Sequence, residues 1–365
     1  MEVPRKDAGN RPIQERIADF GEVEQTLNEA DRKLQASRCM DCGVPFCNWG
    51  CPLGNIMPEW QDDIYTGDWD KAIENLHLTN NFPEFTGRIC PAPCEKSCVL
   101  GINDNPVTIR ENEAAAAEKG FDLGFIKPKP PKTRTGKKVA VIGSGPAGMA
   151  CADLLNKWGH TVTLFEKDDS VGGLLRYGIP DFKLDKRVLD RRLEQLAAEG
   201  VRFEPCIEVG VDISVRALRR QSDAILLTMG AGQPRALSVP GAGYEGVHYA
   251  MQYLAQQNRR VAGEPIDDDP RKAIHARGKQ VVVIGGGDTG SDCVGTAIRH
   301  GAARVTQLEI LPKPPEGRNP ETPWPLWPKI MRTSSSHEEG CERRWSTLTK
   351  ALTGRDIQVT HLHGC

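Results

Sequence analysis

The chain has 365 residues, of which 39% are hydrophobic and 26% are charged. At roughly 150 residues per domain, this length predicts two or three domains with ordinary apolar cores. The 47 basic and 49 acidic residues leave a net charge of −2, so composition gives no reason to expect a nucleic-acid or membrane partner. No apolar run approaches the ~18 residues of a membrane span, and the charged N-terminus lacks the apolar core of a signal peptide. We therefore expect a cytoplasmic protein.

Cysteines are concentrated near the N-terminus. Seven of the twelve lie between positions 39 and 98, and the other five are scattered singly. In a chain without a secretion signal, such a concentration indicates metal binding rather than a disulfide framework. The spacing is Cys-x2-Cys-x4-Cys-x3-Cys-Pro followed by Cys-x3-Cys-x3-Cys. This pattern is typical of proteins that bind iron–sulfur clusters.

The order of the cysteines predicts how they divide between two 4Fe–4S clusters. In two-cluster ferredoxins the cysteine of the Cys-Pro pair binds the other cluster, so the two groups exchange one ligand each. The first cysteine set is then Cys39, Cys42, Cys47 and Cys98. The second cysteine set is Cys51, Cys90 and Cys94. Two such clusters need eight ligands, so the eighth is a non-cysteine group or a cysteine from elsewhere.

Zinc is the alternative occupant of these cysteines. Zinc sites usually combine two separated Cys-x-x-Cys or Cys/His pairs. Only one Cys-x-x-Cys pair is present in this region, and its single histidine, His77, lies inside a helical pattern. The spacing therefore favours iron–sulfur clusters over zinc.

A dinucleotide-binding pattern follows the cysteine-rich region. An apolar strand runs into Gly143-Ser-Gly145-Pro-Ala-Gly148, and an Ala-rich helix comes next. The first glycine permits a tight turn, the second lets the backbone approach a pyrophosphate, and the third allows close packing of helix on strand. The next expected strand, 161–165, ends at Glu166, whose carboxylate can accept hydrogen bonds from ribose hydroxyls.

The same pattern restarts in the last third of the chain. The glycine motif GGGDTG at 285–290 follows an apolar strand, and the next expected strand, 304–308, ends at Glu309. A carboxylate there favours a free 2′-hydroxyl and hence NAD, because it repels a 2′-phosphate. Lys313 and Arg318 follow shortly afterwards and can still bind that phosphate. These residues leave NAD and NADP both open.

Four longer segments carry a family resemblance: CMDCGVPFC at 39–47, NNFPEFTGRICPAPC at 80–94, GGLLRYGIPDF at 172–182 and SSSHEEG at 334–340. They resemble the small (β) subunit of bacterial NADPH-dependent glutamate synthase, over nearly the whole chain. The resemblance implies a multidomain protein with an α-helical, ferredoxin-like domain holding two 4Fe–4S clusters, then α/β Rossmann-like FAD and NADPH domains. It also implies that NADPH reduces FAD and that electrons pass through the clusters to a large (α) subunit, which makes glutamate from glutamine and 2-oxoglutarate.

The resemblance also implies which residues contact the cofactors. The expected FAD contacts are Gly143, Ser144, Gly145, Ala147, Gly148, Glu166, Gly172, Gly173, Leu174 and Gly230. The expected NADPH contacts are Gly285, Gly287, Asp288, Thr289, Gly290 and Glu309. Glu113 occupies the place of a non-cysteine cluster ligand and is the candidate for the eighth ligand, with an exposed helix carboxylate as the alternative. We expect no catalytic acid or base, because hydride transfer to flavin needs none, and we expect His337 to be a loop residue with local hydrogen bonds.

The expected domains are an iron–sulfur domain at 1–126, the first part of an FAD domain at 127–235 and an NADPH domain at 236–365. Prolines and basic residues at 126–136 predict an extended linker between the first two. In the family the chain returns to complete the FAD domain with a strand and helix that carry a Gly-Asp motif. Gly354-Arg-Asp356 lies in an expected hairpin turn, and nothing else after Glu309 matches that motif. We therefore expect an incomplete return and an impaired flavin site.

Other functions fit the same motifs. The electron-input unit of a dihydropyrimidine-dehydrogenase-like enzyme, or another flavin iron–sulfur oxidoreductase, shares the cysteine and glycine patterns. A non-catalytic iron–sulfur adapter that docks on a large subunit is the alternative outside enzymes. A disulfide reductase of the thioredoxin-reductase kind fits less well, because its chemistry needs two close cysteines near the flavin and none are that close after Cys98.

Overall fold

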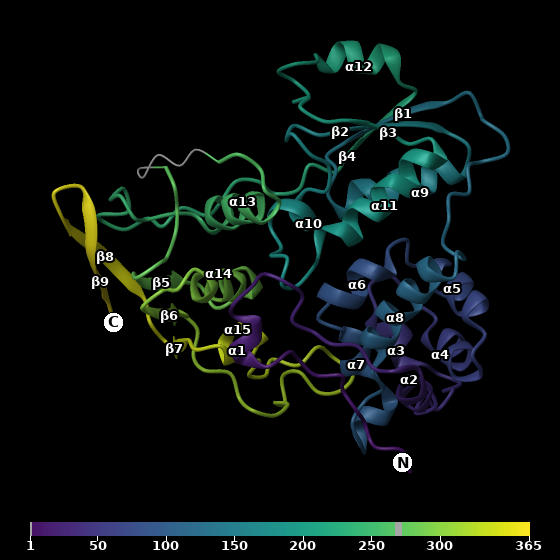
Figure 1. Ribbon diagram of the computed structural model, residues 1–365, viewed down its shortest axis with the longest axis horizontal. Helices are drawn as coiled ribbons and strands as arrows, with labels where there is room; N and C mark the ends of the chain where they lie inside the picture. The colour runs from purple at the N-terminus through teal and green to yellow at the C-terminus, as the bar shows by residue number, and fades with distance from the viewer. Residues whose placement is uncertain (1, 267–271) are drawn as a thin grey trace.

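The computed structural model describes residues 2–266 and 272–365. Figure 1 shows three groups of elements: a bundle of short helices, a parallel sheet covered by helices, and a smaller sheet beside a long hairpin. We call them the helical unit (2–126), the first α/β unit (127–235) and the second α/β unit (236–266 and 272–365). This architecture is the multidomain helical and Rossmann-like fold that the sequence predicts. The boundaries at 126 and 235 remain predictions.

Short helices joined by turns make up the helical unit. They are α1 (Ile13–Arg16), α2 (Glu29–Ala36), α3 (Phe46–Gly50), α4 (Met57–Thr66), α5 (Trp69–His77), α6 (Pro83–Ile89), α7 (Pro93–Ser97), the 3-10 helix η1 (Val99–Ile102) and α8 (Ile109–Asp122). Proline lies in the first turn of α4, α6 and α7, where its missing N–H costs no helical hydrogen bond. Helices this short depend on tertiary packing for stability. Trp60, Ile64 and Leu76 form the buried centre, and the cysteine-bearing turns pack against it.

The first α/β unit is a parallel sheet with helices on both faces. Its elements are β1 (Lys138–Ile142), α9 (Pro146–Lys157), β2 (Thr161–Phe165), α10 (Leu174–Tyr177), α11 (Lys186–Glu199), β3 (Arg202–Glu204), α12 (Val215–Gln221) and β4 (Ala224–Leu227). The strand order is β3-β2-β1-β4, and all neighbours are parallel. The inner strand β1 reads as a continuous apolar run because both of its faces are buried. Helices α9 and α11 cover one face and α12 covers the other (Figure 1).

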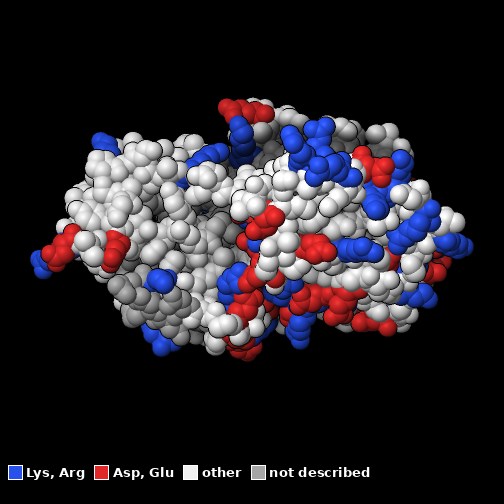
Figure 2. All heavy atoms as spheres, turned by 90° about the horizontal axis from the view of Figure 1, so that it is seen from above, with Lys and Arg blue, Asp and Glu red and all other residues white. Residues whose placement is uncertain are grey.

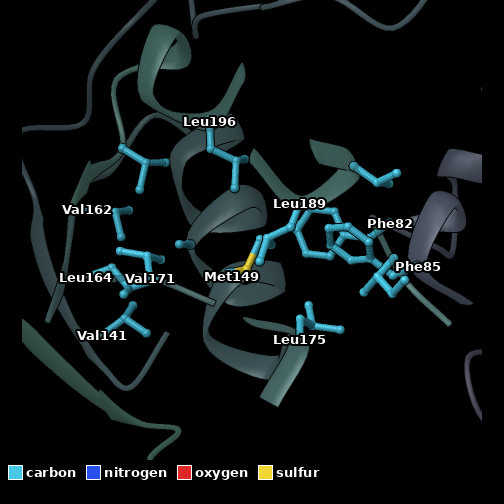
Figure 3. Packing of buried hydrophobic residues seen from close by; sticks show 14 of the residues in the cluster. Phe82, Phe85, Val141, Met149, Val162, Leu164, Val171, Leu175, Leu189 and Leu196 are labelled. Atoms are coloured by element: carbon cyan, nitrogen blue, oxygen red, sulfur yellow. The ribbon is translucent and has the colours of Figure 1, made fainter. Parts of the chain in front are cut away.

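The helical unit contributes directly to the core of the first α/β unit. Phe82 and Phe85, at the start of α6, pack in the same cluster as Met149, Leu175 and Leu189. Figure 3 shows the two rings lying against Leu189, on the side of the cluster away from the strands. Although the expected linker at 126–136 is mostly exposed and has no helix or strand, the two units are joined by this shared core.

The second α/β unit contains α13 (Ala250–Val261), β5 (Gln280–Ile284), α14 (Asp288–Arg299), β6 (Arg304–Leu308), α15 (Ser335–Glu338), β7 (Glu342–Arg344), β8 (Thr349–Arg355) and β9 (Gln358–Gly364). Strands β5, β6 and β7 form a parallel sheet in that order, and α14 packs on one face. The antiparallel pair β8–β9 turns at Asp356, whose φ is +55°. This confirms the expected hairpin turn.

Within residues 272–365, every named strand belongs to the β5-β6-β7 sheet or to the hairpin, so none of them joins the sheet of the first α/β unit. Leu227, at the end of the edge strand β4, is 66% exposed. The impaired flavin site that we expect from the sequence stays a prediction.

The surface carries charges of both signs. In the view of Figure 2, acidic and basic side chains are interspersed over the side of the molecule on which the first α/β unit faces the viewer, while the end with the hairpin is sparsely charged on this face. This distribution agrees with the net charge of −2. Among the described residues, no helix is both long and apolar enough to cross a bilayer.

Candidate functional site

Four predicted ligands line one cavity in the helical unit. They are the members of the first cysteine set, Cys39, Cys42, Cys47 and Cys98. Cys39 follows α2, Cys47 lies in α3 and Cys98 follows α7, so three elements bring these thiols together. The ligand exchange between the two cysteine groups requires Cys98 at this place. Ligation by these thiols stays a prediction, and their common cavity supports it.

The thiols of this cavity are costly to ionise without a cation. Burial, with a smaller contribution from the nearby Cys98, raises the pKa of Cys47 to about 12 and the pKa of Cys39 to about 11. Metal coordination deprotonates a thiol outright because it supplies the missing positive charge. The chemistry of this donor set therefore fits an iron–sulfur cluster.

The arrangement of the thiols separates an iron–sulfur cluster from zinc. Across residues 2–266 and 272–365, no three His, Cys, Asp or Glu side chains converge as a single metal ion would need. A tetrahedral zinc site would hold its four sulfurs about 2.3 Å from one centre. Each cysteine of a 4Fe–4S cluster binds a different iron, so its four sulfurs stand further apart. Four thiols around a cavity without a common point favour the cluster.

The second cysteine set gathers near Glu113. Cys51 follows α3, Cys90 ends α6 and Cys94 lies in α7. Burial raises the pKa of Cys90 and of Cys94, and the proximity of Glu113 and Cys51 adds to both shifts. These three cysteines and the carboxylate therefore share one neighbourhood.

Glu113 is 6% exposed on the inner face of α8, so the alternative of an exposed helix carboxylate is wrong. Burial raises the pKa of Glu113 to about 7. The Asn80 amide donates a hydrogen bond to its Oε1 at 3.1 Å, and the Thr86 hydroxyl donates to the same oxygen. From the part of the chain that the structure describes, no hydrogen bond reaches Oε2. That oxygen can serve as the eighth ligand, a role that stays a prediction.

The first glycine motif forms an open cradle at the end of β1, the first cradle (143–148). Gly143 has φ +100°, and a Cβ there would lie 2.5 Å from the carbonyl oxygen of Thr228. A Cβ on Gly148 would lie 1.9 Å from the carbonyl oxygen of Gly143. At Gly145, by contrast, a Cβ would have no neighbour within 4 Å. The outer glycines serve packing, and the middle one borders open space before the N-terminus of α9, where a pyrophosphate fits.

Glu166 ties the first cradle to the strand beside it. Its Oε2 accepts hydrogen bonds from the Ser144 backbone N–H at 3.1 Å and from the Ser144 hydroxyl at 2.5 Å. Its Oε1 accepts from the backbone N–H of Asp168 at 3.0 Å. The hydroxyl of Ser144 in turn accepts from the N–H of Gly172 at 2.9 Å. A carboxylate accepts about four hydrogen bonds, so Glu166 retains capacity for one ribose hydroxyl.

The other predicted flavin contacts border the same cradle. A Cβ on Gly173 would lie 2.9 Å from the Cα of Gly145, so this loop touches the cradle directly. Leu174 opens α10 and is 58% exposed. Gly230 follows β4 with φ +68° and open space beside it. Ala147 lies in the first turn of α9. The residues present therefore fit FAD, although each contact remains a proposal.

Replacing Gly145 with alanine is expected to weaken FAD binding by about tenfold or more, because the new methyl group stands in the pyrophosphate space. The stability of the flavin-free protein should change by less than about 0.5 kcal/mol, since the φ of −63° suits alanine and the space is empty. Flavin fluorescence titration and thermal unfolding measure the two effects. Gly148→Ala is the matched control, and it should lower the unfolding temperature as well as the FAD affinity. Unchanged FAD affinity in Gly145→Ala would contradict the assignment of the pyrophosphate to this cradle.

The second glycine motif, at 285–290, repeats this geometry and is called the second cradle. The Gly286 N–H donates to Glu309 Oε2 at 2.9 Å, and the Leu311 N–H donates to Oε1 at 2.8 Å. A Cβ on Gly290 would lie 2.4 Å from the carbonyl oxygen of Gly285, whereas one on Gly287 would meet nothing within 4 Å. Asp288 and Thr289 form the first turn of α14. The middle glycine again borders open space at a helix N-terminus.

The two cations that the sequence offers for a 2′-phosphate have different surroundings. Arg318 donates to the carbonyl oxygens of Lys96 and Leu326, at 2.6 Å each, and so binds the helical unit. Lys313 lies 3.4 Å from Glu316, with its side chain about half exposed. Arg318 is therefore engaged elsewhere, and of these two cations Lys313 is the one available to a nucleotide.

His337 lies in α15, so the loop position that we expect is wrong, and of its two hydrogen-bond partners only Ser334 is local in sequence. Its Nδ1 lies 3.1 Å from the Ser334 backbone nitrogen, and its Nε2 lies 2.8 Å from Gln307 Oε1. Burial lowers the pKa of His337 to about 4, so the ring is neutral near pH 7. Both ring nitrogens serve the structure of the second α/β unit.

The sequence of this chain is similar to those of known protein families and proteins. Residues 16–124 match the family described as dihydropyrimidine dehydrogenase domain II, 4Fe–4S cluster, and residues 137–322 match pyridine nucleotide-disulphide oxidoreductase. The chain is 53% identical over 359 residues to glutamate synthase [NADPH] small chain of Mycobacterium tuberculosis (strain ATCC 25618 / H37Rv), covering 98% of this chain and 74% of that protein. It is 47% identical over 379 residues to the same-named protein of Bacillus subtilis (strain 168), covering 100% and 76%.

Glutamate synthase [NADH] of Saccharomyces cerevisiae (strain ATCC 204508 / S288c) is 44% identical over an alignment of 360 residues, which covers 96% of this chain and 17% of that protein. The likeness to small chains covers nearly all of this sequence, and the two domain matches agree with its helical and α/β units. The chain belongs to the glutamate synthase small-chain family, with an iron–sulfur domain followed by FAD- and NADPH-binding oxidoreductase domains.

Proposed function

We propose that this chain is the electron-input subunit of a glutamate synthase. It takes electrons from NADPH on the second α/β unit, transfers them through FAD on the first α/β unit to two 4Fe–4S clusters in the helical unit, and delivers them to a large subunit. The observation that carries the proposal is the presence, in one packed chain, of two open glycine cradles and two gathered cysteine sets. Each of these parts is needed for such a relay.

The order of the parts follows from electron counting. FAD, when bound, accepts two electrons together and releases them singly, which connects a hydride donor to one-electron iron–sulfur clusters. The chain's own residues bind and orient these groups. The N-termini of α9 and α14, which begin in the two cradles, point their N–H groups and positive dipole ends at the pyrophosphates.

Helix α6 connects the first α/β unit to the second cysteine set. Phe82 and Phe85 lie in the core of the first α/β unit, and the same helix ends at Cys90. Seven helical residues span only about 10 Å, so Cys90 is held at a set distance from that core. This supports the second cysteine set as the first electron acceptor after FAD.

The first cysteine set supports the exit of electrons to a partner. Exposed apolar side chains lie close in sequence to its ligands Cys42 and Cys47: Val44 is 70% exposed and Trp49 is 65% exposed. Leu53, which follows Cys51 of the second set, is 49% exposed. Exposed apolar patches are typical of protein–protein contacts. We propose that the large subunit covers these side chains, that the pair works in the cytoplasm, and that neither nucleic acid nor a membrane is a partner.

NADPH is the proposed electron donor. Two relatives that carry NADPH in their names are 53% and 47% identical to this chain, whereas one that carries NADH is 44% identical. Glu309 opposes this choice through its negative charge, and Lys313 favours it. Because one lysine binds the 2′-phosphate, we expect the protein to prefer NADPH over NADH by about tenfold.

Anaerobic rapid mixing of the FAD-saturated protein with NADPH tests the proposed function. We expect loss of flavin absorbance, with NADPH about tenfold more efficient than NADH. Flavin occupancy is measured first, from absorbance after denaturation. A preference for NADH would show that Glu309 decides the nucleotide. Absence of reduction by either nucleotide would contradict the proposed function and favour a non-catalytic adapter.

A further inference from the structure

The N-terminal segment 10–25, called the strap, runs from the helical unit across both α/β units. The N–H of Val23 donates to the carbonyl oxygen of Phe182 at 3.0 Å, in the first α/β unit. The carbonyl oxygen of Asp19 accepts from Arg299 Nε at 3.0 Å, in the second α/β unit. Figure 1 shows the strap helix α1 beside α14 and α15, apart from α2 to α8. Glu22 of the strap also binds Arg88 of α6 at 2.8 Å, so the strap joins the rest of the helical unit to both α/β units.

A buried carboxylate lies at the centre of this contact. Glu339 follows α15, and its Oε1 lies 2.9 Å from Arg16 Nε of the strap, although that N–H is not aligned for a hydrogen bond. Its Oε2 lies 2.6 Å from Nη1 of Arg299, at the end of α14. The side chains of Arg16, Arg299 and Glu339 are 2%, 0% and 0% exposed. Glu338 Oε2 lies 3.2 Å from Nη2 of Arg16, so the two carboxylates Glu338 and Glu339 balance the charges of the two arginines.

The first α/β unit completes the junction. The guanidinium carbon of Arg299 lies 3.9 Å from the ring centroid of Phe182. Phe182 ends the segment that begins with Gly172 and Gly173, and Gly173 borders the first cradle. One guanidinium group therefore contacts the strap, the turn after α15 and the segment that borders the flavin site.

Stability alone does not explain a buried junction of this kind. Desolvation of buried charges often cancels their attraction, and apolar side chains of similar size commonly stabilise a protein as well or better. The best-attested use of a buried charged group is to select one arrangement of the parts that it joins. The ion pair of Glu339 with Arg16 joins the second α/β unit to the strap, and its ion pair with Arg299 joins the turn after α15 to the end of α14 within that unit.

Helix α14 makes that arrangement important for the nucleotide. It begins at Asp288 in the second cradle and ends at Arg299 in the junction. Its 12 residues span about 18 Å, so a tilt of about 5° at Arg299 would move the cradle by about 1.6 Å. A misplacement of about 1 Å can lower the rate of a reaction by about 100-fold.

We propose that Glu339 is a positioning residue. By binding Arg16 and Arg299, it holds the second α/β unit in the orientation that brings a nicotinamide on the second cradle to a flavin on the first. This inference rests on the proposed function. It states in addition that the second α/β unit keeps one orientation during turnover.

The variant Glu339→Gln tests the inference, because it keeps the size of the side chain and removes its charge. In the FAD-saturated protein we expect kcat for flavin reduction to fall about tenfold or more. The Kd for NADP+ should change less than about twofold, because the second cradle is intact. Backbone amide hydrogen exchange in α1 and α15 should rise, with or without cofactors. Glu342→Gln is the matched control, since Glu342 pairs with Arg304 and Arg344 at the edge of the same unit.

Equal losses in kcat and in NADP+ affinity would overturn the inference, as would faster exchange with an unchanged kcat. If Glu339→Gln does not fold, Arg16→Lys is tested instead, because it keeps the positive charge at position 16. We expect a smaller loss of kcat and a smaller rise in amide exchange than in Glu339→Gln. Wild-type kcat and wild-type exchange in Arg16→Lys would overturn the inference. Failure of the wild-type protein to react with NADPH would instead contradict the proposed function. In that case amide hydrogen exchange alone tests the inference, and unchanged exchange in α1 and α15 of Glu339→Gln would overturn the positioning role.

Discussion

The Cys98→Ala variant is expected to retain about four of the about eight iron atoms that two 4Fe–4S clusters bring to each chain. Cys98 lines the cavity of the first cysteine set, although its neighbours in sequence are Cys90 and Cys94 of the second. Loss of one thiolate should therefore remove the cluster at Cys39, Cys42 and Cys47 and leave the other. Iron, sulfide and zinc analysis of anaerobically purified protein measures this result.

Two further variants complete this experiment. Cys365→Ala removes an exposed cysteine outside both sets and should keep all of the iron. Cys94→Ala should also halve the iron, but by removing the second cluster, which electron paramagnetic resonance distinguishes from the first. Full iron content in Cys98→Ala, or a spectrum identical to that of Cys94→Ala, would contradict the exchange of ligands. Stoichiometric zinc with little iron in the wild-type protein would contradict both clusters.

The Arg192→Ala variant should destabilise the joint between the helical and first α/β units by about 3–5 kcal/mol, because it leaves a buried carboxylate without its partner. Arg192 binds Glu84 through two hydrogen bonds, of 2.6 and 2.8 Å, and the two side chains are 3% and 0% exposed. Its guanidinium carbon also lies 4.9 Å from the centroid of Phe121. The first unfolding transition should move down by on the order of 10 °C.

Differential scanning calorimetry measures this effect, and the first transition is compared because a chain of several units need not unfold in one step. Arg187→Ala is the matched control on the same helix, since its side chain is 90% exposed beside Asp185 and such solvent-screened pairs contribute little to stability. The double variant Glu84→Leu/Arg192→Leu should recover most of the stability, because it removes the unpaired charge. A midpoint for Arg192→Ala equal to that of Arg187→Ala would contradict the role of the pair.

Local patterns in the sequence predicted the elements that carry the cofactors. The strand expected at 161–165 is β2, and Glu166 and Glu309 each follow a strand directly, as expected. These features could be predicted because a glycine turn, an apolar run and a terminal acid lie within about 25 residues of one another. The meeting of Cys98 with the first cysteine set was also predictable, because a known ligand spacing encodes that long-range contact.

Contacts between distant residues could not be predicted in the same way. Arg16 lies 322 positions from Glu338 and next to it in space, and no motif links the two. Arg318 follows a nucleotide-binding strand, which suggested a phosphate ligand, but tertiary packing directs it to Lys96. Glu113 lies on an Ala-rich helix, where small apolar residues on several faces give little indication of which face is buried. Burial of such groups depends on the packing of whole units.

Freeze-quench electron paramagnetic resonance, with the FAD-saturated protein mixed anaerobically with NADPH, tests whether electrons pass from NADPH through FAD to the clusters. It follows the flavin and the iron–sulfur clusters in the same sample. Our account predicts that signals of reduced 4Fe–4S clusters appear after the flavin absorbance is lost, without any added carrier. Clusters that dithionite reduces but that stay oxidised after NADPH has fully reduced the flavin would contradict it.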